Sequence, residues 1–461
     1  MIILGTNSIK DTGYDVANSL RFNSGSSDYL NRTLSTPTNR RKWTFSMWVK
    51  RSNISSASTS YLLSVNSSQA YVYFNTDDTF NIEQYSGGYQ YRLKTNRVFR
   101  DTSAWYHLVI RFDSTNGTAD DRVRIYINGV QETSFSARTN PSLNFDGAIN
   151  NNNAHFIGRD AASYWGGYMS EITFIDGQSL DPTSFGEFDE DSGIWKPIDV
   201  SGLTFGTNGF YLDFENSGAL GADVSGNTNN FTVNNLTAID QSISTPTNIF
   251  ATMNPLDVPA SNQPTFSEGN LKVTSPSAAG TANFGGASTF AVSSGKWYVE
   301  AKATVGAGGY SRNRIGITGN ESTARLNASL GANSYEYFYD SEAGNSNAGS
   351  YGDSYTTGDI IGIALNLDDN ELKFYKNGTV QDSGTAISIT ASSSTSIGGY
   401  KITQGDSSGV SGATSTFEFN FGSPPYSESG GETDGNGYGN FAHAVPGGYY
   451  SLNTKNLAEY G

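Results

Sequence analysis

The sequence contains no cysteine. This absence excludes disulfide bonds, thiolate metal ligands and a cysteine nucleophile, and it allows folding in a reducing cytoplasm. Long apolar runs are missing too: residues 2–4 are too short for the core of a secretory signal, and no stretch reaches the length of a membrane span. We therefore expect no membrane insertion. If the protein works outside a cell, we expect it to leave by some route other than ordinary secretion, such as assembly into a particle released on lysis.

Clusters of positive charge are equally scarce. The chain has 28 Lys and Arg against 44 Asp and Glu, which gives a net charge of −16. Nucleic acids and anionic membranes favour proteins with clustered Lys and Arg, so neither is expected as the main partner. Colloidal solubility is the simpler explanation of the acidic balance.

The abundant residue types describe short strands separated by turns. The chain has 52 Gly, 27 Tyr and 26 Phe, and no segment longer than about ten residues keeps a 3.6-residue apolar period. A length of 461 residues accommodates two or three domains. The predicted fold class is all-β, with two antiparallel β-sandwich (jelly-roll) domains joined by a partly structured linker.

Two similar hairpins anchor this prediction. Residues 123–131 (VRIYINGVQ) and 372–381 (LKFYKNGTVQ) are alternating strands that run into Asn-Gly and then continue. Asn-Gly between alternating apolar residues is the strongest short signal of a tight hairpin turn. Each hairpin lies late in its own half of the chain, so each is expected in its own sandwich.

The first sandwich is expected at residues 19–180. At residues 43–50, Trp, Phe, Met and Val alternate with Thr, Ser, Trp and Lys, which predicts a half-buried strand. The order of the motifs resembles the laminin-G-like, concanavalin A-like jelly-roll family: SLRF (19–22), DYL (28–30), FSMWV (45–49), WYHLV (105–109), IYING (125–129) and YMSEITFID (168–176).

The segment 181–264 is expected to be a linker with one structured part. YLDF (211–214) and DVSGN (223–227) resemble the opening of a laminin-G-like domain, although no second such domain follows. We therefore predict that residues 208–236 fold back and complete the first sandwich, in a permuted arrangement. Such permutation is tolerated when the termini of a domain lie close together.

The second sandwich is expected at residues 265–426. Its motifs resemble the SPRY (B30.2) family: KWYVE (296–300), GDIIG (358–362), FYKNG (374–378) and FNFG (419–422). The tail at residues 427–461 has few apolar residues and is expected to be loop. Residues 1–18 are expected to form an arm.

No catalytic constellation stands out. The concanavalin A-like fold implies a glucanase as the plausible enzyme, and retaining hydrolysis needs two carboxyl groups about 5–5.5 Å apart. In EITFID (171–176) the two acids are five residues apart, which places them on opposite faces of a strand. His107 lies in an aromatic-rich strand and is predicted to be a packed strand residue. The chain is therefore predicted not to be an enzyme.

Two kinds of binding site remain as hypotheses. The laminin-G-like resemblance implies a Ca²⁺ site at Asp223 and Asn227, and a metal-free Asx turn is the alternative. Aromatic and acidic residues in loops are candidate ligand contacts, because aromatic faces pack on sugar rings and carboxylates accept hydroxyl hydrogen bonds. Core packing is the alternative for each of these residues: Asp160, Tyr164, Trp165, Tyr335, Tyr337, Tyr339 and Asp340.

A wider resemblance concerns the opening and the linker. ILGTNSI (3–9), YDVANSLRF (14–22) and STPTNIFATMNP (244–255) look like segments of tailed-bacteriophage structural proteins. That resemblance implies a fibre or adhesin on the tail or head of a virion, assembled in the host bacterial cytoplasm. The arm would dock to other virion proteins, and the sandwiches, in a homo-oligomer with a trimer favoured, would bind host-surface glycan or protein without catalysis. A capsid or tail decoration or connector protein and a polysaccharide depolymerase are the alternatives.

Overall fold

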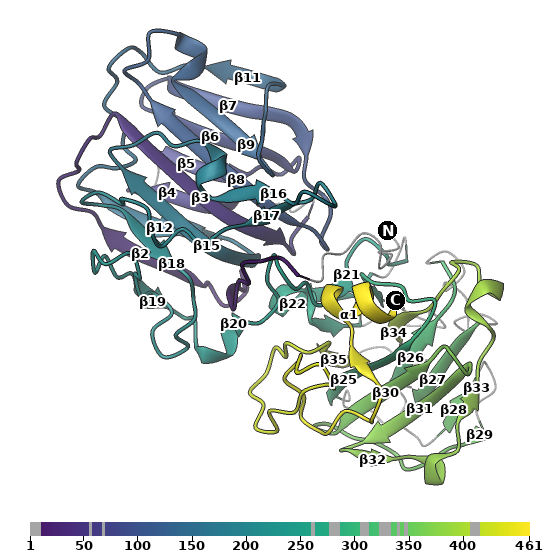
Figure 1. Ribbon diagram of the computed structural model, residues 1–461. Coiled ribbons are helices and arrows are strands. Elements are labelled where there is room, and N and C mark those ends of the chain that lie inside the picture. The colour runs from purple at the N-terminus through teal and green to yellow at the C-terminus, as the bar shows by residue number, and fades with distance from the viewer. Residues whose placement is uncertain are drawn as a thin grey trace. The chain divides into compact units, whose positions relative to one another are not determined.

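The computed structural model describes residues 11–54, 58–66, 70–259, 263–275, 286–304, 313–321, 333–338, 342–344, 349–405 and 415–461. These residues form two compact units: the first comprises Thr12–Thr247, and the second is built mainly from Asn248–Gly461. Each unit contains large, mainly antiparallel sheets (Figure 1), so the predicted all-β class with two β-sandwiches is confirmed. Among the described residues, no helix is long and apolar enough to cross a membrane.

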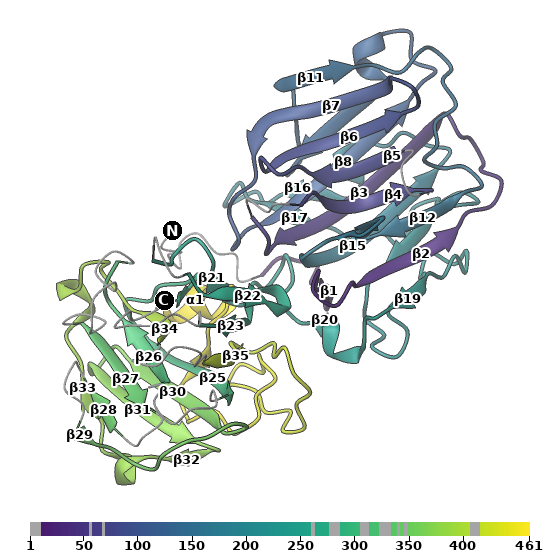
Figure 2. The ribbon, with the colours of Figure 1, turned by 180° about the vertical axis from the view of Figure 1, so that it is seen from behind.

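Two facing sheets make up the first unit, as Figure 2 shows from behind. The first sheet runs, in spatial order, through β10 (Val130–Gln131), β9 (Val123–Ile127), β8 (Trp105–Asp113), β3 (Lys42–Arg51), β15 (Gly167–Asp176), β1 (Ser19–Phe22) and β20 (Gln241–Ser242), with β18 (Phe210–Leu212) also on β15. The second runs through β11 (Phe135–Thr139), β7 (Tyr89–Val98), β6 (Thr79–Tyr85), β5 (Ala70–Phe74), β4 (Ser60–Val65), β12 (Ala154–Ile157), β2 (Tyr29–Thr33) and β19 (Thr232–Asn234).

Alternation along β3 builds the core of this unit. Trp43, Phe45, Met47 and Val49 face the second sheet and are fully buried. The opposite face was predicted to be exposed, and that prediction is wrong: Trp48 and its polar neighbours are buried as well. Residues 180–211 explain this, because several of their apolar side chains pack on that face of the sheet.

His107 shows how tightly the second face of β3 and β8 is covered. Its ring is stacked between Trp48 and Trp195, with ring centroids 4.7 and 5.9 Å away. The Trp195 Nε1 donates a hydrogen bond to His107 Nδ1 at 2.9 Å, so the ring proton resides on Nε2, which lies 2.8 Å from Ser46 Oγ. Burial lowers the pKa of His107 to about 3. The predicted packing role of His107 is confirmed.

Both predicted Asn-Gly hairpins are confirmed. β9 pairs with β10 across Asn128 and Gly129, and β31 (Glu371–Lys376) pairs with β32 (Thr379–Val380) across Asn377 and Gly378. All four turn residues have positive φ angles, between 47° and 78°. A type I′ turn needs this left-handed backbone at both central positions, which is why Asn-Gly specifies it.

The segment 181–264, expected as a linker, is divided between the two units. Residues up to 247 belong to the first unit, where β16 (Gly186–Phe188) pairs with β17 (Trp195–Pro197). Within residues 208–236, β18 pairs with β15 in one sheet, and β19 pairs with β2 in the other. The second unit begins at Asn248, and β21 (Met253–Asn254) already lies in one of its sheets.

Two sheets also make up the second unit. One runs through β21, β24 (Gly286–Ser288), β34 (Lys401–Gly405), β26 (Arg314–Thr318), β27 (Ser334–Phe338), β28 (Glu342–Gly344) and β29 (Gly349–Ser350). The other runs through β22 (Thr265–Ser267), β23 (Lys272–Thr274), β35 (Thr416–Asn420), β25 (Lys296–Thr304), β30 (Ile360–Asn366), β31 and β32, with β33 (Ile387–Ser388) on β31 and β36 (Tyr450–Ser451) on β25.

The tail at residues 427–461 is more ordered than the sequence predicted. β36 pairs in parallel with β25, and α1 (Thr454–Tyr460) follows it with Asn453 as the N-cap, whose side chain accepts from the Asn456 backbone N–H. Leu452 and Leu457 lie in the core of the unit. The expectation of a loop tail is therefore corrected: few apolar residues suffice here because buried polar contacts hold the segment.

An arm was expected at residues 1–18, and residues 1–10 of it lie outside the described residues. Residues 12–18 belong to the first unit. The Val16 backbone N–H donates to Thr247 Oγ1 at 3.1 Å, and Val16 itself is buried. This part of the chain is packed on the sandwich rather than extended away from it.

Candidate functional site

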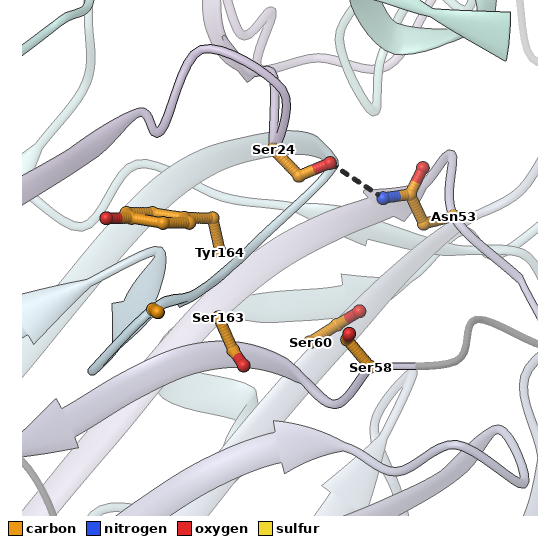
Figure 3. A pocket seen from close by; sticks show the side chains of 7 residues that line it. Ser24, Asn53, Ser58, Ser60, Ser163 and Tyr164 are labelled. Atoms are coloured by element: carbon orange, nitrogen blue, oxygen red, sulfur yellow. Dashed lines mark hydrogen bonds between the residues drawn. The ribbon is translucent and has the colours of Figure 1, made fainter.

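A polar pocket of about 230 Å³ opens at one end of the first unit, where three connections meet. They are the turn between β1 and β2, the described residues 52–54 and 58–59 between β3 and β4, and the ribbon formed by β13 (Arg159–Asp160) and β14 (Ser163–Tyr164). Figure 3 shows the labelled side chains around the hollow. The pocket is lined by Ser24, Asn53, Ser58, Ser60, Ala162, Ser163 and Tyr164.

Local hydrogen bonds position the loops on one side of the pocket. The turn that carries Ser24 is closed by Asp28, whose Oδ2 accepts from the Asn23 backbone N–H at 2.7 Å. Asn53 Nδ2 donates to Ser24 Oγ at 3.1 Å, which joins this turn to the β3–β4 connection (Figure 3). A Cβ atom at Gly166 would lie 2.4 Å from the Asn53 amide nitrogen, so a larger residue at that position would displace the Asn53 side chain. The polar rim is therefore built by specific contacts.

Tyr164 is held by an aromatic cluster on the other side. Its ring centroid lies 6.3 Å from that of Tyr29, which in turn lies 6.2 Å from that of Phe156. The guanidinium of Arg159, the direct cross-strand partner of Tyr164, lies over all three rings at 4.5 to 5.9 Å from their centroids. Cation–π and aromatic contacts of this kind each stabilise by about 0.5–1.5 kcal/mol.

The pocket chemistry suits a small hydroxyl-rich molecule. The described lining residues supply hydroxyl groups, one amide and one aromatic ring, and none of them is charged. Hydroxyl and amide groups both donate and accept hydrogen bonds, as sugar hydroxyls do. The volume is below the ~300–1,000 Å³ typical of clefts for drug-sized ligands, so a single ring rather than a larger group fits inside.

The structure separates the neighbouring candidate residues Asp160, Tyr164 and Trp165. Tyr164 lines the pocket and is half-buried. Trp165 is fully buried, and its ring stacks on Phe74 with centroids 5.9 Å apart, so it cannot contact a ligand. Asp160 is 7% exposed, and burial raises the pKa of its carboxyl. The core-packing alternative therefore describes Trp165, and the ligand-contact hypothesis stays with Tyr164.

The second unit offers no exposed aromatic cluster at its described predicted positions. Tyr335 and Tyr337 are 6% and 0% exposed, and both pack in the core. The Tyr335 hydroxyl lies 3.0 Å from Thr390 Oγ1, and the Tyr337 hydroxyl donates to the Asp353 carbonyl. They are corrected from ligand contacts to core residues. Tyr339 and Asp340 lie outside the described residues.

Asp223 holds a turn. Its carboxylate accepts from the backbone N–H groups of Tyr211, Ser225 and Asn229 at 2.7 to 2.9 Å. Asn227 is exposed, and its amide donates to the carbonyls of Gly206 and Gly209. These contacts are those of the Asx-turn alternative. In the part of the chain that the structure describes, no group of three or more His, Cys, Asp or Glu side chains is placed to hold a metal ion.

The two acids of EITFID have separate environments. Asp176 is 1% exposed and accepts only from neighbouring backbone and amide donors. Glu171 lies in a β-bulge of β15 with φ of 50°, and it accepts from the hydroxyls of Tyr211 at 2.6 Å and Tyr14 at 3.2 Å. Neither residue lines the pocket.

Glu171 gives the first unit a predicted pH dependence. Burial raises the pKa of Glu171 from its ordinary 4.5 to about 7. Between these values the folded protein holds a proton that the unfolded chain has released, so stability falls as pH rises from 4.5 to 7. Relative to Glu171→Gln, the wild type is expected to lose on the order of 3 kcal/mol of unfolding free energy across this window. Urea unfolding at pH 4.5, 5.5, 6.5 and 7.5 measures the difference, and parallel curves for the two proteins would contradict it.

Several residues of the site had no signal in the sequence. Ser24, Asn53 and Ser60 are single polar residues in a chain rich in Ser and Asn, and they converge only through the fold. Tyr29 and Phe156 lie on adjacent strands that are more than a hundred residues apart in sequence. A clue was available in Arg159, a basic residue directly before the candidate ligand contact Asp160.

Two family profiles match separate parts of the chain. The concanavalin A-like lectin/glucanases superfamily matches residues 24–182, and the SPRY domain matches residues 296–395. Both predicted domain types are thereby confirmed. Neither match covers half of the chain, so they identify domains rather than a family for the whole protein. No relative was found among curated proteins.

The similar solved structures include a SPRY domain and two bacterial proteins. The SPRY domain of human HERC1 is 14% identical, with a TM-score of 0.30, and the match covers 36% of this chain and 96% of that one. A putative carbohydrate binding protein from Bacteroides ovatus is 14% identical, with a TM-score of 0.35, over 48% of this chain and 59% of that one. Domain 4 of AbnA, a GH43 extracellular arabinanase from Geobacillus stearothermophilus, is 22% identical, with a TM-score of 0.24, over 31% and 64%. At these scores, none of them indicates a ligand for this chain.

Proposed function

We propose that the first unit binds carbohydrate at the pocket beside Tyr164, without catalysis. The main support for carbohydrate binding is the composition of the pocket lining. Hydroxyl and amide groups line the described sides of a small hollow, and one aromatic ring is held at its edge. A sugar ring packs its C–H face on an aromatic side chain while its hydroxyls hydrogen-bond to the rim. The concanavalin A-like fold of this unit supports the proposal, since that superfamily includes lectins.

The wider role we propose is attachment to a host cell. The chain would be displayed on a bacteriophage tail or head in several copies, as a homo-oligomer, and would bind host-surface glycan. Weak single sites gain avidity when several are linked, which suits a pocket of this size. This role rests on the resemblance of residues 3–22 and 244–255 to virion proteins. A purely structural decoration protein would leave the pocket without a ligand.

Tyr164→Ala tests the proposed binding site. Removal of the ring is expected to weaken glycan binding at least tenfold, about 1.4 kcal/mol, because the stacking surface is lost while the polar rim remains. Binding of the purified chain to an array of bacterial surface glycans, followed by titration calorimetry on the best ligand, measures the effect. Tyr85→Ala is the matched control, since Tyr85 is 50% exposed and lies outside the pocket lining. The proposal would be contradicted if both variants lost the same amount of glycan affinity, or if the wild type bound no glycan.

A further inference from the structure

Arg159 differs from the other arginines of the first unit that lie over aromatic rings. Arg51 lies over Phe74, Arg92 over Tyr89 and Arg138 over Phe135. Each of these three also forms an ion pair, with Asp78, Glu83 and Asp120 respectively, at 3.0 to 3.3 Å. Ion pairing thus accompanies ring stacking at every one of these comparison sites.

Arg159 lies over three rings and has no carboxylate partner among the described residues. Its Nε donates to the Ala161 carbonyl at 2.9 Å, which fixes the plane of the guanidinium. Its terminal nitrogens make no hydrogen bond to the described part of the protein. Asp160 follows Arg159 in β13, and successive side chains of a strand point to opposite faces. Burial raises the pKa of the Asp160 carboxyl and outweighs the lowering effect of the guanidinium, but no ion pair joins the two side chains.

This arrangement leaves an oriented, charged donor pair beside the pocket. The guanidinium is half-buried, and its Cζ lies 5.9 Å from the ring centroid of Tyr164, which lines the pocket. A planar guanidinium presents parallel N–H donors that match a carboxylate, and rings that hold it in place reduce the entropy lost on binding. Arg32, Arg40 and Arg122 of this unit also bind amide or backbone carbonyl oxygens rather than carboxylates. Among the described arginines of the unit, Arg159 alone lies over aromatic rings without an ion pair.

We infer that the glycan bound by the first unit is acidic, with one sugar ring in the pocket and a carboxylate of the same or the adjoining sugar on Arg159. This inference rests on the proposed carbohydrate binding and names the class of glycan. The uncharged lining forms hydrogen bonds with the hydroxyl groups of the sugar ring, while the Arg159 guanidinium binds the carboxylate and so favours acidic glycans. Tyr164 belongs to both parts of the site, because its side chain lines the pocket and carries the guanidinium.

The test compares ligands that differ only in charge. Oligogalacturonate, its methyl ester, hyaluronan oligosaccharide and its carboxyl-reduced form are titrated into the full-length chain, together with a sulfated galactan oligosaccharide and a panel of neutral glycans. Each acidic probe that binds is expected to bind ten to a hundred times more tightly than its neutral counterpart, the usual value of a charge-assisted hydrogen-bond pair. The preference is expected to shrink as salt is raised.

Variants assign the preference to Arg159. Arg159→Gln is expected to abolish the preference and to retain binding of the neutral counterpart, which also shows that the pocket is folded. Arg159→Lys is expected to keep only part of it, because a lysine lacks the planar donor pair. Arg138→Gln is the matched control, since Arg138 also lies over a ring and is on β11, at the far edge of the sheet from β2.

The outcomes separate the two proposals. If glycans bind but the acidic and neutral forms bind equally, or if Arg159→Gln leaves the preference unchanged, the inference is overturned and carbohydrate binding stands. Preference for the sulfated probe over both carboxylates also overturns it, because the recognised acid is then a sulfate ester. If neither neutral nor acidic glycans bind, both the inference and the proposed function fail.

Discussion

Replacement of Asp176 by alanine is expected to lower the free energy of unfolding of the first unit by about 3–5 kcal/mol. The buried carboxylate accepts from the backbone N–H groups of Thr38, Asn39 and Asn208 and from the Asn150 side chain, at 2.6 to 3.1 Å. Alanine would leave these donors buried without an acceptor, and such groups cost more than the lost hydrogen bonds themselves.

Thermal unfolding of the wild type and the variant measures this loss. For a unit of this size, about 3–5 kcal/mol corresponds to a fall in melting temperature of roughly 6–20 °C. The melting temperature of Asp176→Asn is expected to lie between those of the wild type and Asp176→Ala. Asparagine keeps one acceptor oxygen but turns an N–H₂ group towards the donors that the second oxygen had accepted from. Asp181→Ala is the control: this acid is 61% exposed and pairs with Arg111, so its loss is expected to cost under about 1 kcal/mol. A melting temperature of Asp176→Ala within 2 °C or so of the control would contradict the argument.

Asp176 shows why the acids of EITFID could not be interpreted from their spacing alone. Their five-residue separation differs from that of a glucanase pair, but spacing alone gives no other role for Asp176. That role depends on Asn150 and Asn208, which the fold brings to the end of β15 from distant parts of the chain. Hydrogen-bond partners at such separations leave no periodic signal in a sequence.

The features predicted best are those fixed by local chemistry. Both Asn-Gly turns form because two adjacent residues favour positive φ, and β3 forms a core strand because its apolar residues recur with period two. The second face of β3 was wrongly predicted to be exposed. Residues 180–211 cover it, and no local sequence pattern indicates this contact. Periodicity states which residues share a face, and the rest of the fold decides whether that face is exposed.

The site was predicted in part for the same reason. Tyr164 and Trp165 are neighbours in sequence, and both are aromatic residues next to glycines, so composition could not distinguish them. Tyr164 ends β14 at the pocket, whereas Trp165, directly after β14, lies in the core, where it meets Phe74. The Ser and Asn residues of the rim come from three connections that meet only in the folded unit.

Asp434→Ala is expected to release the C-terminal tail and to lower the free energy of unfolding of the second unit by about 3–5 kcal/mol. Asp434 is 5% exposed, and its Oδ1 accepts from the backbone N–H groups of Asn436 and Tyr438. Its Oδ2 accepts from the backbone and hydroxyl of Ser451 and from the Asn456 amide, at 2.6 to 2.9 Å. One carboxylate thus joins the turn at residues 434–438, β36 and α1.

Limited proteolysis and thermal unfolding together distinguish this outcome from a general loss of stability. Cleavage after residue 427 should become fast in Asp434→Ala at a temperature where the first unit stays folded, because β36 and α1 have few apolar residues to hold them once the carboxylate is gone. Glu432→Ala, two residues away and exposed, should leave the tail resistant. If the tail of Asp434→Ala remains resistant, then Leu452 and Leu457 suffice to anchor it, and apolar contacts rather than buried hydrogen bonds order this part of the chain.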